Sequence, residues 1–353
     1  TNHYDLPWDM LVANGYAFMS AKYTQITSDL NGGDSEADAF NGVCELWGPR
    51  DPKATDSPGA LMVWAWGLMR GLDLAERIDG IDATRNVVIG SSRLGKAALL
   101  AAAYDERFAV CVPNQTGAIG VQLMKRNYGE TLKGQRLAFP HWYCPAVWKY
   151  ADDPTRQPFD QHLLLACVAP RNLLLECYHK KWFDPTGEFL AARAAAPVWK
   201  FLGEETLTAT NRPAAYDETF ARPPFGYVTR TECHGLSPYD WKWALSFANA
   251  AFAKADAPRA FAARLNAEIA RVSAAGGGRV TVPVGVHETG TMVLRSNVEL
   301  HLEKGAVLLG STNFADYPLF RTLRTPSQKD VNGWTALIYA AGETNIAVTG
   351  QGT

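Results

Sequence analysis

Three features are scarce in this chain of 353 residues: runs of basic charge, paired cysteines and long apolar segments. The formal net charge is -2 and the pI is about 6.4. Because no Lys/Arg-rich run is present, the sequence lacks the electrostatic footprint of a protein that binds nucleic acid or an anionic membrane surface. The most apolar long stretch, residues 60–74, contains Arg70 and Asp73 and is too short to span a bilayer. We therefore expect neither nucleic acid nor a membrane as a partner, and interpret this stretch as a buried helix.

The six cysteines are scattered and form no C-x-x-C pair, so the sequence shows no zinc or redox motif. They are Cys44, Cys111, Cys144, Cys167, Cys177 and Cys233. Four of them lie inside apolar runs, where we expect small buried thiols. No signal peptide is visible, but the chain opens on Thr1 and begins as if inside a domain. We therefore expect the N-terminus, with any leader, to be missing.

Up to about Lys254, short apolar runs alternate with helix-like segments, which predicts a mostly parallel α/β sheet. The expected strands are Tyr16–Tyr23, Asn86–Ile89, Ala109–Pro113, Asn172–Cys177 and Tyr227–Glu232. Ser57 and Pro58 mark a helix start before the apolar stretch that opens at Ala60. Two further helices are expected, at Glu188–Leu202 and Tyr239–Ala253.

The pattern changes near Asp256. An amphipathic helix is expected at Arg259–Ala274, and three glycines at 276–278 follow it. Short β-like runs come next, with the sequences "RVTVPVG", "GTMVLRS", "VELHLEKGAVLLGS" and "NIAVTGQGT". Short strands joined by glycine turns, with no helices between them, predict a stacked-strand solenoid, of which only the first coils fit before Thr353. We therefore expect two domains, 1–254 and 255–353, with the second cut at its C-terminus.

The stretch "GSSRLGK", Gly90 to Lys96, fits two kinds of site, because it lies between a strand and a helix. A phosphate-binding loop needs a Ser or Thr directly after the lysine to hold Mg²⁺, and this chain has Ala97 there. Such a loop also needs a carboxylate at the end of another strand, and Glu176 is the only weak candidate. The sequence therefore favours the second interpretation, a nucleophile elbow with Ser92 as its serine.

A hydrolase with this elbow needs an acid and then a histidine later in the chain, in that order. His234, in "TECHGLSPYDW", follows the last expected strand and is the candidate general base. Asp184, in "WFDPTGEF", follows the strand before it and is the candidate acid, although Glu188 lies four residues further on and could take its place. The helix that follows Ser92 points its N-terminal N–H groups toward a developing oxyanion.

At this point the chain resembles the glucuronoyl esterases, carbohydrate esterase family 15. The likeness covers most of residues 1–254 and rests on a set of motifs in order: "GSSRLGK", "AAAYDERFAV", "FPHWYC", "FDQHLLLACVAPRNLLL", "WFDPTGEF" and "HGLSPYDW". It implies an α/β-hydrolase three-layer sandwich and cleavage of an ester between glucuronic acid on xylan and an alcohol that is lignin-derived in plant walls. No cofactor or metal is implied.

The resemblance also implies roles for single residues. Ser92 would be the nucleophile, Arg93 would hold the oxyanion and Lys96 would bind hydroxyls of the uronic acid. Trp182 would line the sugar site, and Glu188 is a further substrate-binding candidate. His234 matches the catalytic histidine of the family.

The chain departs from the family at Gln115. Many members have a glutamate at this position, in a pattern like P-Q-E-S-G, whereas this chain reads "PNQTG". A neutral amide cannot stabilise an imidazolium as a carboxylate does. Because some bacterial relatives use an acid on the later loop, the expected triad is Ser92, His234 and Asp184.

The C-terminal segment has its own resemblance, to the start of pectin-degrading polygalacturonases of glycoside hydrolase family 28. It implies the first coils of a right-handed parallel β-helix without the catalytic aspartates, and adds weight to a plant cell-wall polysaccharide as substrate. The two resemblances together imply a secreted or periplasmic protein. Three other functions stay open: an acetyl or feruloyl esterase, an inactive glycan-binding module, and a nucleotide hydrolase.

Overall fold

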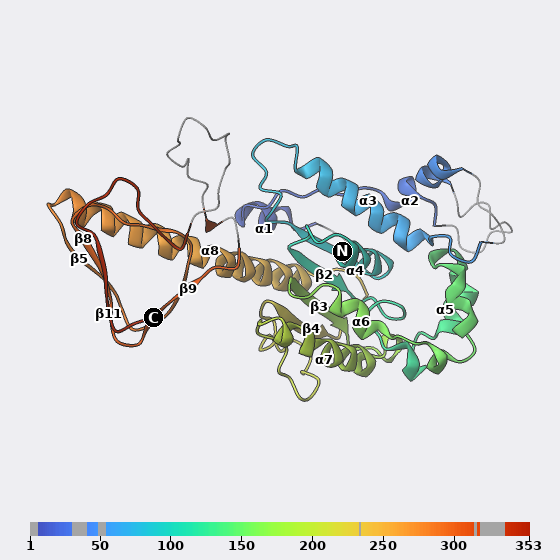
Figure 1. Ribbon diagram of the computed structural model, residues 1–353. Coiled ribbons are helices and arrows are strands. Elements are labelled where there is room, and N and C mark those ends of the chain that lie inside the picture. The colour runs from blue at the N-terminus through green and yellow to red at the C-terminus, as the bar shows by residue number, and fades with distance from the viewer. Residues whose placement is uncertain (1–5, 30–40, 49–53, 233, 314–315, 318–335) are drawn as a thin grey trace. The chain divides into compact units, whose positions relative to one another are not determined.

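The computed structural model describes residues 6–29, 41–48, 54–232, 234–313, 316–317 and 336–353 (Figure 1). Cys233 lies outside these residues. By its internal contacts the chain divides into two compact units, Thr1–Ala251 and Phe252–Thr353. Each unit is described by itself below.

The first unit is built on a parallel sheet of four described strands in the order β1-β2-β3-β4 (Figure 1). These are β1 Val87–Ser91, β2 Val110–Asn114, β3 Asn172–Tyr178 and β4 Phe225–Arg230. All residues of β2 and β4 are buried, as expected for parallel strands covered on both faces. The four apolar runs predicted as strands from Asn86 onward are confirmed, although β4 begins and ends two residues earlier than expected.

Four helices pack around this sheet: α3 Ala60–Ala75, α4 Arg93–Tyr104, α6 Gln161–Ala166 and α7 Pro185–Phe201. Helix α4 contacts β1 and β2 and is itself covered by α3, whereas α7 contacts β3 and β4 and packs against α6 (Figure 1). The main hydrophobic core joins residues of α3, α4, α7 and the strands, with Leu99, Leu173, Trp199 and Tyr227 fully buried in it. The predicted helix at 60–74 is therefore confirmed as a buried element.

The loops of the first unit contain several short helices. The α-helices are α1 Trp8–Ala13, α2 Tyr23–Ile26 and α5 Leu132–Ala138. The 3-10 helices are η2 Gly42–Trp47, η3 Met124–Arg126, η4 Pro140–Trp142, η5 Pro145–Tyr150, η6 Pro154–Arg156 and η7 Lys181–Phe183.

Two expectations about secondary structure are wrong. The segment 16–23 is not a strand: its apolar residues Tyr16 and Phe18 pack on Trp241 instead of pairing with a sheet edge. The helices expected at 239–253 and 259–274 are one continuous helix, α8 Pro238–Ala274, with Pro258 inside it. A proline removes one backbone hydrogen bond within a helix, but the apolar residues on both sides of Pro258 are buried in their own units and keep the segment helical.

The described residues of the second unit form three small parallel sheets. Strands β5 Gly278–Val282 and β11 Ala347–Gly350 flank β8 Val298–Leu302, while β6 Gly285–Thr289 pairs with β9 Ala306–Gly310 and β7 Met292–Val293 with β10 Ile338–Tyr339. Its core consists of inward residues of these strands and of three residues of α8, Leu265, Ile269 and Val272. The amphipathic pattern of 259–274 therefore buries one face of the helix against the first strands.

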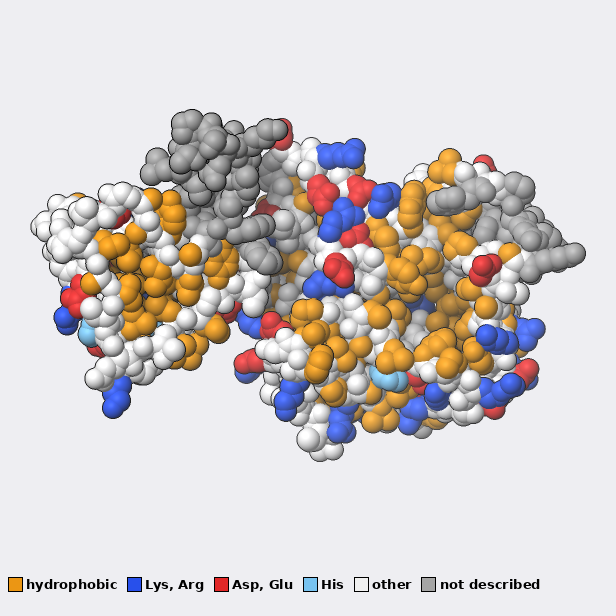
Figure 2. All heavy atoms as spheres, in the orientation of Figure 1, with side chains coloured by type: hydrophobic (Ala, Val, Ile, Leu, Met, Phe, Trp, Pro, Cys, Tyr) orange, Lys and Arg blue, Asp and Glu red, His pale blue; other side chains and the backbone are white. Residues whose placement is uncertain are grey.

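The surface of the described residues is mixed in charge, and the described cysteines differ in burial. On the face that Figure 2 shows, acidic and basic side chains are interspersed among the residues drawn in colour. Within the described ranges, none of the helices combines the length and apolarity needed to cross a bilayer. Cys44, Cys111 and Cys177 are buried free thiols, while Cys144 is partly exposed and Cys167 is exposed, so fewer of them are buried than the apolar runs predict.

Candidate active site

The turn between β1 and α4 has the geometry of a strained elbow. Ser92 lies there with φ 58° and ψ -124°, a conformation that L-residues rarely adopt. The turn is tight because a Cβ on Gly90 would lie 2.3 Å from the carbonyl oxygen of Leu94, and one on Gly95 would lie 2.7 Å from that of Asn114. The backbone N–H of Ser92 donates to the same Asn114 oxygen at 2.8 Å. Ser92 is thus held at the carboxyl end of β1, directly before the first turn of α4.

His234 occupies the loop between β4 and α8. Its Nδ1 lies 2.7 Å from the Oε1 of Gln115, and its ring stacks on Phe183 with centroids 5.1 Å apart. Burial lowers the pKa of the imidazole; the charge of Glu130 opposes this shift, whereas the positive charges of Arg230, Lys96 and Arg93 add to it. Arg93 and Lys96 belong to the first turn of α4, so the imidazole lies within electrostatic range of the elbow and is uncharged at neutral pH. Among the described residues, no hydrogen bond joins His234 to Ser92.

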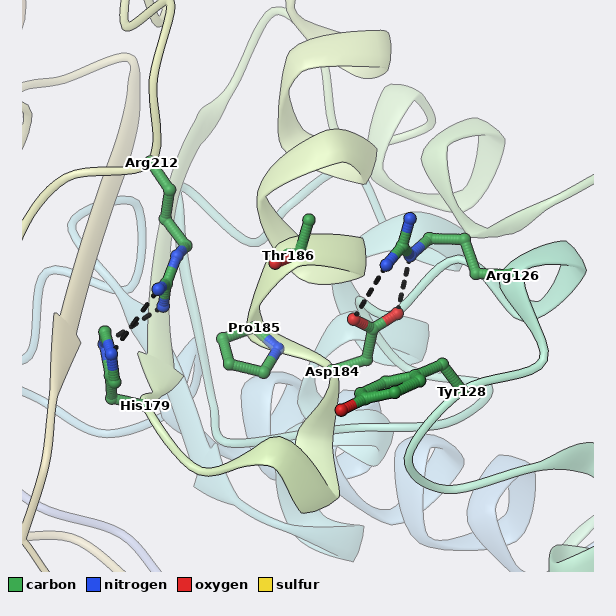
Figure 3. Close-up of a pocket in the computed structure, with 7 residues that line it drawn as sticks. All are labelled: Arg126, Tyr128, His179, Asp184, Pro185, Thr186 and Arg212. Atoms are coloured by element: carbon green, nitrogen blue, oxygen red, sulfur yellow. Dashed lines mark hydrogen bonds and ion pairs between the residues drawn. The ribbon is translucent and has the colours of Figure 1, made fainter.

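Among the described residues, Asp184 is hydrogen-bonded to Arg126 and not to His234, the partner expected from the sequence. The Asp184 carboxylate is buried and accepts from Arg126 Nε at 2.8 Å and from its NH2 at 3.4 Å (Figure 3). Asp184 has a left-handed φ of 42° at the N-cap of α7, and its side chain contacts Arg126 at the end of η3. Because the buried charge already has a cationic partner, Asp184 holds the loop before α7 in place.

A cavity of about 450 Å³ lies beside this ion pair. It is lined by Arg126, Tyr128, His179, Asp184, Pro185, Thr186 and Arg212 (Figure 3). On its opposite wall the guanidinium of Arg212 contacts both ring nitrogens of His179, at 3.0 and 3.4 Å. Burial and the charge of Arg212 lower the pKa of His179, so this histidine is also uncharged at neutral pH.

The Glu188 side chain is fully buried and contacts the loop that follows β2. Its Oε1 accepts from the backbone N–H of Gly117 at 3.3 Å. Burial raises the pKa of this carboxyl to about 8, which keeps it protonated at neutral pH. The hydrogen bond from Gly117 shows that Glu188 supports the backbone of this loop.

Arg93 is held by a carboxylate that the sequence analysis did not single out. Asp29 forms an ion pair with Arg93 and accepts from Trp142 Nε1 at 2.7 Å. It also contacts His141 Nε2 at 3.0 Å and accepts from the Tyr23 hydroxyl at 3.3 Å. These bonds hold the pKa of Asp29 well below its usual range, against the effect of burial. The Arg93 guanidinium also lies over the Trp142 ring, 4.6 Å from its centroid. The guanidinium beside Ser92 is thereby fixed.

Lys96 and Trp182 meet at a second carboxylate that the sequence analysis missed, Glu130. Lys96 Nζ lies 3.8 Å from Glu130 Oε2, which also accepts from the backbone N–H of Ala118 at 2.9 Å. Trp182 Nε1 donates to Glu130 Oε1 at 2.9 Å, and its ring remains 66% exposed. Burial lowers the pKa of Lys96, and the charge of Glu130 partly offsets this. The arrangement offers a flat exposed ring next to a buried cation and anion.

Each of the missed carboxylates is linked to its partner only by the tertiary fold. Asp29 lies 64 residues from Arg93, and Glu130 lies 52 residues from Trp182. Neither stands in a motif of its own, so no local signal could have found them. In the part of the chain that the structure describes, no cluster of three His, Cys, Asp or Glu side chains is arranged to hold a metal ion.

Comparison with known proteins gives consistent matches for the first unit. The family model described as "Glucuronyl esterase, fungi" matches residues 4–203. The chain is 34% identical over 241 residues to carbohydrate esterase MZ0003 from an unknown prokaryotic organism, covering 67% of this chain and 54% of that protein. It is 29% identical over 198 residues to the 4-O-methyl-glucuronoyl methylesterase of Hypocrea jecorina, covering 54% of this chain and 41% of that protein.

Solved structures of glucuronoyl esterases also match the chain. A glucuronoyl esterase from Solibacter usitatus superposes with a TM-score of 0.63 at 35% identity, covering 69% of this chain and 61% of that one. A CE15 esterase from a marine bacterial metagenome superposes with a TM-score of 0.62 at 33% identity, covering 69% and 60%. The first unit therefore has the α/β-hydrolase fold, and the chain spans between about two fifths and three fifths of the length of these relatives.

Proposed function

Because the chain belongs to the glucuronoyl esterase family, carbohydrate esterase family 15, we propose that its first unit is a serine carboxylesterase. Its substrate is the ester between a glucuronic acid side group of xylan and an alcohol, as in lignin–carbohydrate esters. The observation that carries this proposal is the strained elbow at Ser92, which a phosphate-binding or purely structural turn has no need to maintain. Such a polysaccharide ester lies outside the cell, so we infer a secreted or periplasmic protein.

The proposed reaction proceeds in two steps. The Ser92 Oγ attacks the ester carbonyl carbon while His234 Nε2 accepts the hydroxyl proton, and the tetrahedral intermediate then expels the alcohol, which takes this proton. Water, deprotonated by the same nitrogen, next attacks the acyl-serine. The second tetrahedral intermediate then releases the uronic acid as His234 returns the proton to the Ser92 Oγ. The uncharged state of His234 at neutral pH suits it to accept a proton in both steps.

The oxyanion and the sugar are assigned to the groups around the elbow. The Arg93 guanidinium and the N-terminal N–H groups of α4 stabilise the negative oxygen, since Asp29 and Trp142 already fix the arginine. Lys96 and Glu130 form the polar floor that bonds sugar hydroxyls, and the exposed Trp182 ring packs against the pyranose.

We further propose that residues 255–353 form the first coils of a right-handed parallel β-helix similar to the start of a polygalacturonase. The parallel pairing supports this, because Glu299 of β8 lies between Arg279 of β5 and Ala347 of β11, as successive coils of a solenoid require. We assign no reaction to this segment.

A second candidate function is an inactive hydrolase-like module that binds glycans. It is favoured by the neutral side chain of Gln115, which faces His234 where an acid stands in many relatives. An acetyl or feruloyl esterase is the third candidate, because an elbow alone does not select the acyl group.

Release of methanol from methyl 4-O-methylglucuronate by the purified chain tests the proposal, with acetate release from acetylated xylan and hydrolysis of methyl ferulate run in parallel. We expect turnover on the uronate ester, lost in Ser92→Ala. Turnover on acetylated xylan or methyl ferulate alone would move the assignment to the third candidate. No turnover on any ester, together with equal binding of acidic xylo-oligosaccharides by wild type and Ser92→Ala, would establish the glycan-binding module.

A further inference from the structure

Gln115 is buried, and both its backbone and its side chain are hydrogen-bonded to neighbouring elements. It directly follows β2, has a left-handed φ of 48°, and is 1% exposed. Its backbone N–H donates to the carbonyl oxygen of Glu176 at 2.7 Å, which ties it to the end of β3. Two residues further on, the backbone N–H of Gly117 donates a hydrogen bond to the buried carboxyl of Glu188. The residue is therefore fixed by its neighbours, and its amide cannot turn toward solvent.

The contacts of Gln115 determine which end of its amide faces His234. Its Oε1 lies 3.1 Å from the backbone N of Gly235, and its Nε2 lies 3.5 Å from the carbonyl oxygen of the same glycine. A backbone N–H can only donate and a carbonyl can only accept, so the opposite orientation of the amide would break both bonds and place donor against donor and oxygen against oxygen. The atom that faces Nδ1 of His234 at 2.7 Å is therefore the oxygen.

An amide oxygen accepts hydrogen bonds and never donates them, so Nδ1 of His234 must carry a proton. In the neutral imidazole this leaves the lone pair on Nε2. We propose that Gln115 is the positioning residue that fixes the Nδ1-protonated tautomer of His234. Its neutral amide then orients the imidazole, as a carboxylate does in other serine hydrolases. The inference deepens the proposed function and rests on it for the role of the histidine, but the tautomer itself does not depend on any activity.

A buried ion pair fixes the position of the loop that carries His234 relative to Gln115. Arg230 donates to the carbonyl oxygen of Gly235 and pairs with Asp240 at 2.8 Å, and both side chains are almost completely buried. Asp240 also accepts from the backbone N–H of Ser237 at 2.6 Å. The backbone N–H and the carbonyl of Gly235 are therefore both hydrogen-bonded. This fixes the two groups that set the orientation of the Gln115 amide.

The charges around His234 come from several elements, and each bears on its titration. Glu130 lies before α5, Arg93 and Lys96 lie in α4, and Arg230 lies at the end of β4. Tyr178 and Phe183 supply the aromatic rings near the imidazole. Because Gln115 adds no charge, replacing it with glutamate places a new negative charge at Nδ1 with little change in shape, which makes the pair Gln115 and His234 testable without disturbing the packing.

The experiment is nitrogen-15 NMR of the His234 ring as a function of pH, in the full chain with selectively labelled histidine. The resonance is assigned by its loss in His234→Gln. We expect the wild type to show the Nδ1-protonated tautomer above the pKa of His234. In Gln115→Ala the ring should change to the Nε2-protonated tautomer that free histidine prefers. In Gln115→Glu the tautomer should persist while the pKa rises by about 1 or more, because an opposite charge lies next to the ring. Gln25→Glu, the same change on the exposed face of α2, is the matched control and should move nothing.

Activity gives an independent readout. We expect kcat for the uronate ester to fall about 10- to 100-fold in Gln115→Ala with little change in KM, and the acid limb of the pH profile to move to higher pH in Gln115→Glu. An Nε2-protonated ring in the wild type, or an unchanged ring in Gln115→Ala of native melting temperature, would overturn the inference. If the tautomers behave as expected but no ester is hydrolysed, the inference stands and the proposed function fails.

Discussion

Replacing Asp184 with asparagine removes a buried negative charge beside Arg126 while keeping the size of the side chain. The two bonds from the guanidinium are charge-assisted, a class that contributes about 1.5–3 kcal/mol each in favourable settings. The Arg126 side chain is 34% exposed, so water takes over part of its solvation when the carboxylate is lost. We therefore expect Asp184→Asn to lower the free energy of unfolding by about 1–2 kcal/mol, which corresponds to a melting temperature about 2–8 °C lower.

The assay combines thermal unfolding with steady-state hydrolysis of the uronate ester. Because Asp184 bonds Arg126 and not His234, kcat of Asp184→Asn at a temperature where the protein is folded should stay within about threefold of wild type. Arg126→Gln is the matched variant, since it breaks the same ion pair from the other side. It should reproduce the loss of stability and leave kcat equally unchanged.

The opposite pattern would refute this reasoning. If Asp184 orients the histidine in the working enzyme, its replacement should lower kcat by a factor on the order of 10⁴, as when an orienting carboxylate is made an amide in serine proteases. Such a fall in Asp184→Asn, with Arg126→Gln fully active, would return Asp184 to the triad.

Two other substitutions test the surroundings of the elbow. Asp29→Asn should lower kcat about 10- to 100-fold in steady-state assays, because the Arg93 guanidinium loses the buried charge that holds it; an unchanged kcat would mean that another group fixes the arginine. The pKa of Glu188 is raised to about 8, so the folded protein keeps a proton that the unfolded chain has lost, and wild-type stability should decline from about pH 4.5 to pH 8. In Glu188→Gln that decline should be smaller, so its melting temperature relative to wild type should rise with pH, whereas parallel pH curves would show that this carboxyl does not titrate there.

The sequence was informative where the signal is local. Strands β1, β2 and β3 are apolar runs bounded by turns, and the elbow at Ser92 is contained within seven residues. The segment 16–23 has the composition of a strand, but its apolar side chains pack against the cluster around Trp241 and the segment pairs with no described strand. Composition alone does not distinguish a paired strand from an irregular segment, because a strand forms only where a second strand lies beside it.

The partners of the site were harder to predict, because they meet through the tertiary fold. Gln115 stood out as a departure from a family pattern, yet its contact with His234 joins residues 119 positions apart. Asp184 followed the expected strand in the expected order, but the left-handed turn before α7 directs its carboxylate to Arg126. Glu188 is a candidate by its charge and its place in the chain, but the fold buries its side chain against the backbone of Gly117, which the sequence alone does not reveal.

The tight elbow also limits how the enzyme can be redesigned. At Gly90 and Gly95 any side chain collides with backbone oxygens, which cannot move aside as a flexible side chain would. A combinatorial library that randomises these two codons would therefore spend nearly all of its members on chains that do not fold around Ser92. In the proposed site, effort to change which ester is accepted is better directed at Trp182, whose ring is largely exposed.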